Sequence, residues 1–230
     1  GVHQDGGMCP LLVVPERKLH VANDLDLEEL ALVETFCIGA HGVERTGPLE
    51  GLPVLVIGAG PIGLGAAQAA QAAGGRVLMV DIAAQRLEFA RSMGLEQTLL
   101  AEGEWEPRIR EAFQGELPLV VMDATGHRGS MEHCLDLAAH GGTILFLGIY
   151  NGPVGIHDPT LHKKELAVLS SRNAPTSTFP QVLQQLREGR ITLKPWITGR
   201  LPASRVPEAF EEGRRAPGTV KLLIDMDLEA

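Results

Sequence analysis

The sequence predicts an α/β fold built on a doubly wound parallel sheet, and three observations support this prediction. Short apolar runs such as VLVI at 54–57 and LVVM at 119–122 show no polar alternation, which is typical of strands covered on both faces. Single helical segments separate these runs, so successive strands must run parallel. A glycine-rich turn, GAGPIG at 58–63, directly follows the first of these strands.

The alternation of strands and helices extends over most of the chain. Strands are expected at 54–57, 77–80, 97–100, 119–122 and 143–147, with helices at 61–73, 83–92, 104–113 and 129–139 between them. Before this core, the pattern predicts two short strands within 10–21 and a helix from Asp26 that ends at Gly47. After it come a helix and a strand within 161–171, helices at 179–188 and 204–214, and a last strand at 219–224.

Composition narrows the class of protein. With 230 residues, 44% hydrophobic and 21% charged, the chain can bury a sizeable core. The net charge of -9 argues against nucleic acid or an anionic membrane as a partner. No apolar run is long enough to span a bilayer and no secretory signal opens the chain, so a cytoplasmic location is expected.

Cysteine and histidine spacing gives no sign of a self-contained metal site. The cysteines, Cys9, Cys37 and Cys134, are far apart, which argues against a disulfide framework or a zinc knuckle and favours small apolar fillers. The histidines form no HxxxH or HExxH pair.

The turn GAGPIG carries the strongest functional signal. Gly58 permits a tight turn, Gly60 lets the backbone approach a pyrophosphate, and Gly63 lets helix and strand pack closely. Pro61 and Ile62 stand at the start of the next helix, whose N-terminal N–H groups would face the phosphates. The pattern predicts a dinucleotide-binding domain of the Rossmann type; a plain tight turn is the alternative.

Asp81 indicates which dinucleotide is bound. It ends the strand at 77–80, where its carboxylate can accept hydrogen bonds from both adenosine ribose hydroxyls and would repel a 2′-phosphate. No Arg or Lys occupies the next four positions, so the expected cofactor is NAD. Arg86 is expected either against the adenine face or as a solvated helix residue.

Two later strand ends point to the other half of the cofactor. Ligands of open parallel sheets lie beyond the carboxyl ends of the strands. Backbone groups of Thr125 in DATG, and of Gly148 and Ile149 in LGIYNG, are therefore expected to line the nicotinamide half. Ordinary turn chemistry remains open as an alternative.

At this point the sequence resembles the medium-chain dehydrogenases/reductases, and among them the zinc-dependent polyol dehydrogenases related to sorbitol and threonine dehydrogenase. The resemblance covers essentially the whole chain. The segments that carry it are DGGMCPLLVVPERKLH, LVETFCIGAHGV, VLVIGAGPIGLGAAQAA, VDIAAQRLEFARSMG, VMDATG and REGRITLKPWITGRLPASRVPEAFEE.

The resemblance implies a domain order. Residues 1–25 would end a GroES-like catalytic domain, 26–165 would form the NAD-binding domain, and 166–230 would return to the catalytic domain. Most of the catalytic domain, with its zinc ligands, would then be absent from this chain. We therefore expect the 230 residues to bind NAD and to catalyse nothing alone.

The resemblance also implies two catalytic residues. Glu34 falls where the family places a glutamate beside the catalytic zinc, as a ligand or through water, although Thr35 replaces the usual proline. An acid in a mainly apolar helix is costly to bury unless paired, so simple exposure is the alternative. Cys37, one helical turn on, is expected in the same cleft or as core filler. Arg172 matches an arginine that approaches nicotinamide and substrate, with a surface arginine as its alternative.

With Asp81 and the glycine turn predicting NAD, the resemblance implies NAD-dependent hydride transfer from a secondary alcohol, a polyol or an aldonate, with zinc as the Lewis acid. One alternative is a zinc-free quinone or enoyl reductase, whose usual preference for NADPH conflicts with Asp81. Another is a regulatory domain that binds NAD without chemistry. A homo-dimer or homo-tetramer is also expected, formed by pairing of an open edge strand at 143–147.

Overall fold

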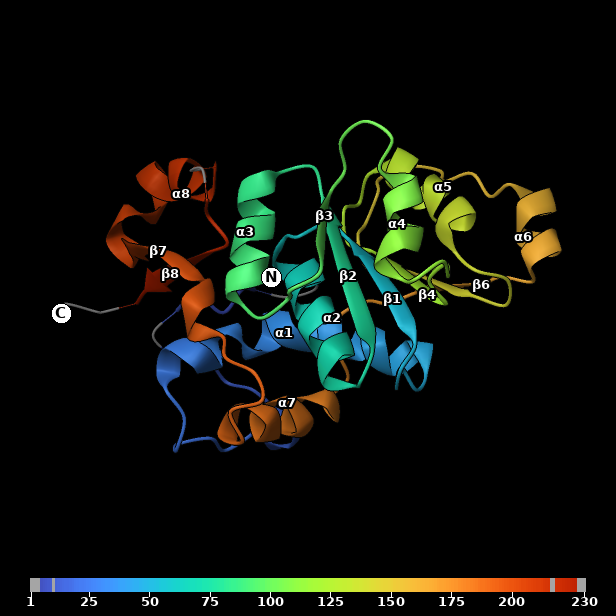
Figure 1. The fold of residues 1–230 in the computed structure, drawn as a ribbon. Helices are drawn as coiled ribbons and strands as arrows, with labels where there is room; N and C mark the ends of the chain where they lie inside the picture. The colour runs from blue at the N-terminus through green and yellow to red at the C-terminus, as the bar shows by residue number, and fades with distance from the viewer. Residues whose placement is uncertain (1–4, 10, 216–217, 227–230) are drawn as a thin grey trace. The chain divides into compact units, whose positions relative to one another are not determined.

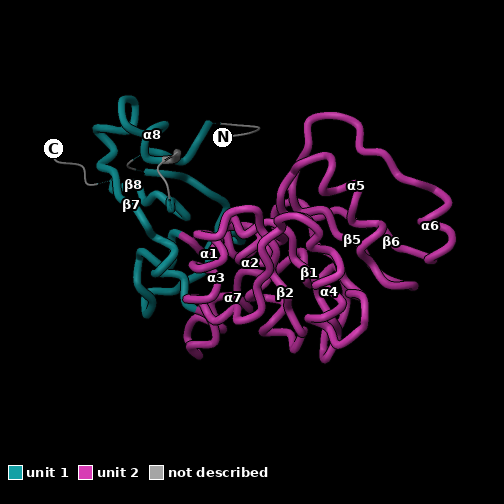
Figure 2. The backbone as a smooth tube through the Cα atoms, turned by 45° about the horizontal axis from the view of Figure 1, so that its top comes forward, with its two compact units in different colours: residues 1–31, 192–230 teal, residues 32–191 magenta. Residues whose placement is uncertain are grey.

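The computed structural model describes residues 5–9, 11–215 and 218–226. The chain forms two compact units, one of residues 1–31 with 192–230 and one of residues 32–191 (Figure 2). The larger unit contains the predicted sheet, so it is the part that positions the candidate site.

The larger unit is built on a six-stranded sheet of order β3-β2-β1-β4-β5-β6, in which each pair of neighbours is parallel. The strands are β1 (Pro53–Ile57), β2 (Arg76–Asp81), β3 (Thr98–Leu100), β4 (Val120–Asp123), β5 (Thr143–Phe146) and β6 (Ala167–Ser170). Strand order reverses between β1 and β4, which creates the crevice of a doubly wound sheet. The predicted α/β fold class is confirmed.

Helices cover both faces of this sheet. They are α1 (Leu27–Thr46), α2 (Pro61–Ala72), α3 (Ala84–Ser92), α4 (Glu106–Ala112), α5 (Arg128–Leu137), α6 (Asp158–Lys164) and α7 (Thr178–Arg187). Because parallel crossovers are right-handed, α2 and α3 lie on one face and α4 and α5 on the other (Figure 1). No helix among the described residues is long and apolar enough to cross a membrane.

The packing of α1 on α2 depends on a small residue. A Cβ at Gly39 would lie 2.3 Å from the backbone nitrogen of Ala66, so the two helices meet backbone to backbone. Cys37, on the same helix, is fully buried. Burial raises the pKa of its thiol to about 12, with Glu34 and Glu44 adding to the effect. Cys37 therefore fills space in the core, which was the second of the two alternatives that the sequence left open.

The core between the sheet and α4 and α5 is apolar. Leu55 and Val121 from the sheet pack with Ile109 and Phe113 from α4 and with Cys134 from α5. Burial also raises the pKa of the Cys134 thiol. The continuous apolar strands predicted this core, because strands of that kind are typical of a sheet whose two faces are both covered.

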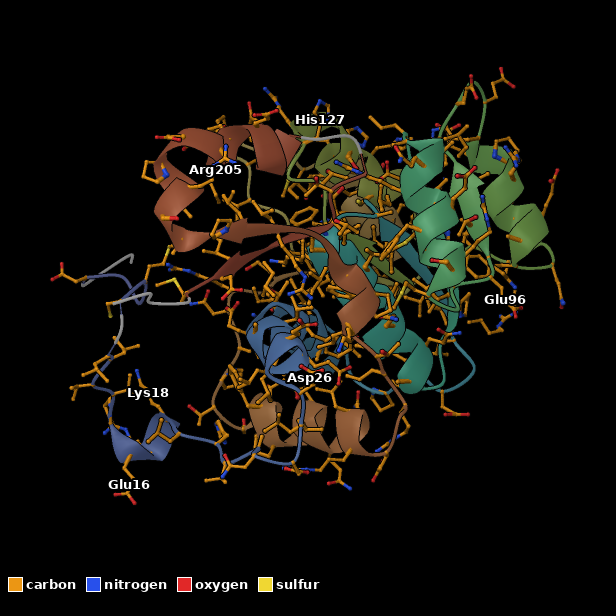
Figure 3. The ribbon with its side chains drawn as sticks, turned by 90° about the vertical axis from the view of Figure 1, so that its left-hand side faces the viewer. Glu16, Lys18, Asp26, Glu96, His127 and Arg205 are labelled. Carbon is orange, nitrogen blue, oxygen red and sulfur yellow. The ribbon has the colours of Figure 1, made fainter. Side chains whose placement is uncertain are left out.

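The smaller unit contains η1 (Glu16–Lys18), η2 (Lys194–Trp196), β7 (Ile197–Pro202), η3 (Ala203–Arg205), α8 (Val206–Arg215) and β8 (Lys221–Asp225). β7 and β8 pair in parallel. The two strands predicted within 10–21 were wrong for the described residues 11–21, which contain η1 and no strand. Leu11 and Val13 are exposed, and this segment pairs with no other strand. A strand needs a hydrogen-bonded partner, and apolar β-branched residues alone do not supply one. Glu16 and Lys18 point outwards from η1 (Figure 3).

Charged side chains join the two segments that make up this unit. Lys194 Nζ lies 2.7 Å from Asp26 Oδ2 and 3.5 Å from Glu28 Oε2, and Arg200 Nη2 lies 2.5 Å from Glu28 Oε1. The hydrogen bond from Lys194, with that from the Glu28 backbone N–H, lowers the pKa of Asp26. These contacts connect residues 26–28 with residues 194–200.

Two sequence-based expectations about the sheet need correction. The strand predicted at 143–147 is not an open edge, because β5 pairs with β4 on one side and β6 on the other. The outer strands of the sheet are β3 and β6. The compact unit also runs past the predicted boundary at 165, because β6 belongs to the sheet. The assignment of the terminal segments to a catalytic domain stays a prediction, and so does the oligomeric state.

Candidate functional site

A cavity of about 710 Å³ lies within the larger unit, at the carboxyl ends of its central strands. Its walls come from the ends of β1, β2 and β4 and from the first residues of α4 and α5. The residues that line it are Ile57, Gly58, Gly60, Val80, Asp81, Ile82, Arg86, Ala101, Trp105, Glu106, Ala124, Thr125, His127, Gly129, Ser130 and His133. This is the position where open parallel sheets bind their ligands.

The glycine turn after β1 shows why each glycine is there. Gly58 has a φ of 101°, which side-chain-bearing residues rarely adopt, and its N–H donates to Val80 O at 2.7 Å. A Cβ at Gly63 would lie 1.7 Å from Gly58 O, so helix α2 could not pack there. A Cβ at Gly60 would instead meet no protein atom within 4 Å. Gly60 lines the cavity, so its missing side chain leaves room for a ligand.

Asp81 both shapes this turn and faces the cavity. It is only 5% exposed. Its Oδ2 accepts a hydrogen bond from the Ala59 N–H at 2.6 Å, and its Oδ1 accepts one from the Ala83 N–H at 2.8 Å. Arg86 Nη1 lies 3.8 Å from Oδ2. A carboxylate has about four acceptor positions, so Asp81 retains capacity for the hydroxyls of a ribose.

The turn after β4 is organised by Asp123, a residue that the sequence analysis did not single out. Its wholly buried carboxylate accepts hydrogen bonds from the Thr125 N–H at 3.0 Å, the Gly126 N–H at 3.3 Å, and the hydroxyls of Thr125 and Ser130. The sequence carried a signal for this role. An Asp that ends an apolar strand before Ala-Thr-Gly is well placed for an Asx turn.

Asp123 also holds the next strand end in place. Its backbone carbonyl accepts hydrogen bonds from the N–H groups of Leu147 at 2.8 Å and Gly148 at 2.9 Å. A Cβ at Gly148 would lie 2.2 Å from the Gly126 nitrogen, and one at Gly126 would lie 2.7 Å from Ile149 O. Of the residues predicted for the nicotinamide half, Gly148 and Ile149 thus lie against the turn that contains Thr125. Thr125 itself lines the cavity.

The other predicted site residues lie elsewhere in the larger unit. Pro61 occupies the first turn of α2, and Ile62 follows it. Glu34 on α1 and Arg172 after β6 are both exposed, and neither lines the cavity. Their predicted roles toward zinc and substrate therefore stay predictions.

The described part of the chain offers no fit for zinc. Among residues 5–9, 11–215 and 218–226, no group of three or more His, Cys, Asp or Glu side chains could hold a metal ion. Glu34 thus lacks companion ligands within these residues, and we derive no chemical step through a metal.

Four residues that line the cavity were not anticipated from the sequence. They are Ala101 after β3, Trp105 and Glu106 at the start of α4, and His133 on α5. His127, labelled in Figure 3, comes from the loop between β4 and α5. A single aromatic or histidine on a helix carries no spacing signal, so only the fold brings these residues together.

The geometry agrees with comparisons to known proteins. The model of a family described as zinc-binding dehydrogenase matches residues 61–188, which is more than half of the chain. This chain belongs to the zinc-binding dehydrogenase family. The resemblance drawn from the sequence is thereby confirmed.

Curated relatives of the chain include two dehydrogenases, which are named here with their similarity to it. The chain is 40% identical over 213 residues to the L-galactonate-5-dehydrogenase of Escherichia coli K12, covering 92% of this chain and 62% of the relative. It is 30% identical over 210 residues to the sorbitol dehydrogenase of Bos taurus, covering 89% of this chain and 58% of the relative. The chain thus spans about 60% of the length of the curated relatives it matches.

Solved structures of other proteins share the fold of this chain. An alcohol dehydrogenase from E. coli CFT073, complexed with NADH, superposes with a TM-score of 0.89 at 27% identity, covering 97% of this chain and 67% of that one. Galactitol-1-phosphate dehydrogenase from E. coli superposes with a TM-score of 0.82 at 25% identity, covering 94% and 66%.

Proposed function

We propose that this zinc-binding dehydrogenase uses NAD(H) to oxidise a secondary alcohol of a polyol or aldonate, and that the larger unit holds the cofactor. One observation carries the cofactor half of the proposal. Gly60 leaves open space at the N-terminus of α2, in the same cavity as the buried carboxylate of Asp81. This pairing suits a pyrophosphate next to an adenosine ribose.

The chain's own groups have distinct roles in this proposal. N–H groups of the turn at 58–63 and the positive end of the α2 dipole bind the pyrophosphate. Asp81 accepts hydrogen bonds from the ribose hydroxyls and repels a 2′-phosphate. The backbone of Thr125, Gly148 and Ile149 lines the nicotinamide half. When bound, NAD supplies the hydride acceptor.

The substrate half of the proposal comes from the relatives. L-galactonate and sorbitol are the substrates in the names of two of them, and both carry secondary hydroxyls. Arg172 is assigned to the substrate and nicotinamide, and Glu34 to the surroundings of the catalytic zinc. Both assignments rest on the family resemblance and not on a contact.

Titration of the chain with NADH and NADPH, followed by nicotinamide fluorescence, tests the cofactor half. We expect NADH to bind at least about tenfold more tightly, because Asp81 repels the 2′-phosphate. Asp81→Ser should reduce this preference, while Glu88→Gln, an exposed change on α3, should leave it intact. Equal or tighter binding of NADPH by the unaltered chain would contradict the proposal.

A substrate panel tests the other half. The full-length gene product is assayed for NADH formation with polyols, aldonates and simple alcohols, and its zinc content is measured in the same preparation. Turnover on a polyol or aldonate is the expected result. NADH binding without turnover on any of them would favour a domain that binds NAD without chemistry. The absence of zinc, together with oxidation of NADPH by a quinone in a parallel assay, would favour the zinc-free reductase.

A further inference from the structure

A second cavity, of about 430 Å³, lies within the larger unit. Its walls come from α1, from the loop between α1 and β1, from the C-terminal half of α2 and from α7. It shares no lining residue with the cavity at the carboxyl ends of the strands. The second cavity is therefore separate from the proposed cofactor site.

Much of the wall of this second cavity is apolar. Val43, Leu49 and Val182 line it and belong to the buried core, so their positions are fixed by packing. Ala69 and Ala72 of α2 also line it, and their short side chains leave the space open. A volume of this size falls within the range of pockets that hold small organic molecules.

The charged side chains that line the second cavity are both acidic. They are Glu44 on α1 and Glu50 in the loop before β1, and none of its described lining residues is Lys, Arg or His. Glu44 Oε2 accepts a hydrogen bond from Thr178 Oγ1 at 3.0 Å and lies 3.2 Å from His41 Nδ1. A carboxylate has about four acceptor positions, so Glu44 retains capacity for a ligand.

Glu50 is exposed, and its carboxylate packs over a glycine. A Cβ at Gly74 would lie 2.0 Å from Glu50 Oε2, so the missing side chain of Gly74 gives this carboxylate its place. No ion pair to Glu50 is present among the described residues. Its charge therefore has no partner within this part of the chain.

The backbone adds to the negative character of the cavity. Helix α1 ends at Thr46 and α2 ends at Ala72, and the lining includes Gly47 and Ala73, which directly follow these helix ends. The C-terminal end of a helix carries a partial negative charge from its unpaired carbonyl groups. Two carboxylates and two helix ends thus favour a cation, and the apolar wall favours a ligand with a hydrocarbon part.

We propose that the second cavity binds a small aliphatic amine. The ammonium group pairs with Glu44 and Glu50, and the carbon chain contacts Val43 and Val182. An ammonium group offers three donors, so it can serve both carboxylates. This site adds a cationic ligand to the protein and does not depend on the proposed function, because it uses none of the residues of the cofactor cavity.

The test compares pentylammonium, pentanol and pentanoate, which have carbon chains of similar length and differ at the polar end. Titrations are followed by the methyl resonances of Val43 and Val182 in the unaltered chain, Glu50→Gln, Glu96→Gln and Ala72→Leu. Glu96→Gln is the matched control, because Glu96, labelled in Figure 3, is exposed and lines neither cavity. Circular dichroism and NADH titration of each variant check that the fold and the cofactor cavity are intact.

We expect the unaltered chain and Glu96→Gln to bind pentylammonium about tenfold more tightly than pentanol, since each exposed ion pair can contribute up to about fivefold. Pentanoate should bind more weakly than pentanol. In Glu50→Gln the ratio of ammonium to alcohol affinity should fall to about threefold. Ala72→Leu fills the space and should weaken binding of both pentylammonium and pentanol about tenfold.

Equal affinities of pentylammonium and pentanol for the unaltered chain would overturn the inference. So would an unchanged ratio in Glu50→Gln, or unchanged affinities in Ala72→Leu. Resonances of Val43 and Val182 that do not respond to pentylammonium would overturn it as well. NADH binding in the same samples tests the proposed function separately, so that the failure of one proposal does not imply the failure of the other.

Discussion

The turns after β1 and β4 both line the cavity, but they are built in opposite ways. The turn after β1 draws its support from another strand, because Asp81 accepts the Ala59 N–H. The turn after β4 is supported from within, because Asp123 accepts the N–H groups of Thr125 and Gly126. The turn after β1 therefore depends on the register of β2, whereas the turn after β4 depends on its own sequence.

The glycines of the two turns differ in the same way. A side chain at Gly60 would meet no protein atom within 4 Å, whereas one at Gly148 would meet the Gly126 nitrogen at 2.2 Å. The first glycine leaves space for something outside the protein, and the second lets the protein's own strand ends meet. Substitution at the two positions should therefore have different consequences, one for binding and one for folding.

Gly148→Ala should have the largest effect on stability. The new Cβ would collide with backbone and not with a flexible side chain, so the strand ends after β4 and β5 must separate. We expect the free energy of unfolding to fall by about 3 kcal/mol. Urea denaturation followed by circular dichroism measures this value. Gly60→Ala, which like Gly148→Ala changes a glycine without a positive φ but meets no protein atom within 4 Å, controls for the loss of glycine flexibility and should cost less. A cost for Gly148→Ala no larger than that of the control would contradict the packing argument.

Asp123→Ala should have the next largest effect, and Asp81→Ala is its matched comparison. Removing the wholly buried carboxylate of Asp123 leaves the N–H groups of Thr125 and Gly126 without their acceptor. The expected loss in the free energy of unfolding is about 2 kcal/mol. Asp81→Ala removes acceptors from Ala59 and Ala83 and should cost about 1 kcal/mol. Equal NADH and NADPH binding is expected only for the Asp81 variant. Urea denaturation and nicotinamide fluorescence on the same preparations check both parts.

Gly60→Ala reverses the pattern of Gly148→Ala. The added methyl group meets no protein atom, so the free energy of unfolding should change by less than about 0.5 kcal/mol. The same methyl group occupies the space proposed for the pyrophosphate, so NADH affinity should fall about tenfold. Fluorescence titration and urea denaturation of one sample separate the two effects. Unchanged NADH affinity would mean that the open space at Gly60 is not used by the cofactor.

The sequence predicted the first turn far better than the second, for a physical reason. Glycine spacing, a preceding apolar strand and an acid at the end of the next strand are all local patterns, so Gly58, Gly60, Gly63 and Asp81 were predicted together. The network of Asp123 depends on contact between the ends of β4 and β5, which only the sheet order reveals.

The same distinction explains the errors. Residues 11–21 have strand-like composition, but a strand needs a partner, and composition does not say whether one exists. The edge of the sheet was placed at β5 although a strand was predicted within 161–171, because the sequence does not show that this strand, β6, pairs with β5. Trp105, Glu106 and His133 reach the cavity from separate helices, and their spacing along the chain gave no sign of this.

The smallest expected effect concerns the loop after β5, which lies beyond the second turn. Glu132 on α5 accepts hydrogen bonds from Arg128 Nε at 2.7 Å and from the Gly155 N–H at 2.8 Å, and these lower its pKa from the usual value of 4.5. Because the pKa is lower in the folded state, this stabilisation is complete above the unfolded-state pKa and is lost as pH falls through the folded-state pKa. Glu132→Gln should therefore have a slightly lower urea midpoint than the unaltered chain at pH 7. The difference should shrink as the pH falls below 4.5, because the carboxylate then becomes protonated. Hydrogen exchange at the Gly155 amide should accelerate in the variant at pH 7. This measurement distinguishes the local loss of the Gly155 hydrogen bond from a lower stability of the whole chain. A difference in midpoint that persists at low pH would mean that Glu132 acts through packing and not through its charge.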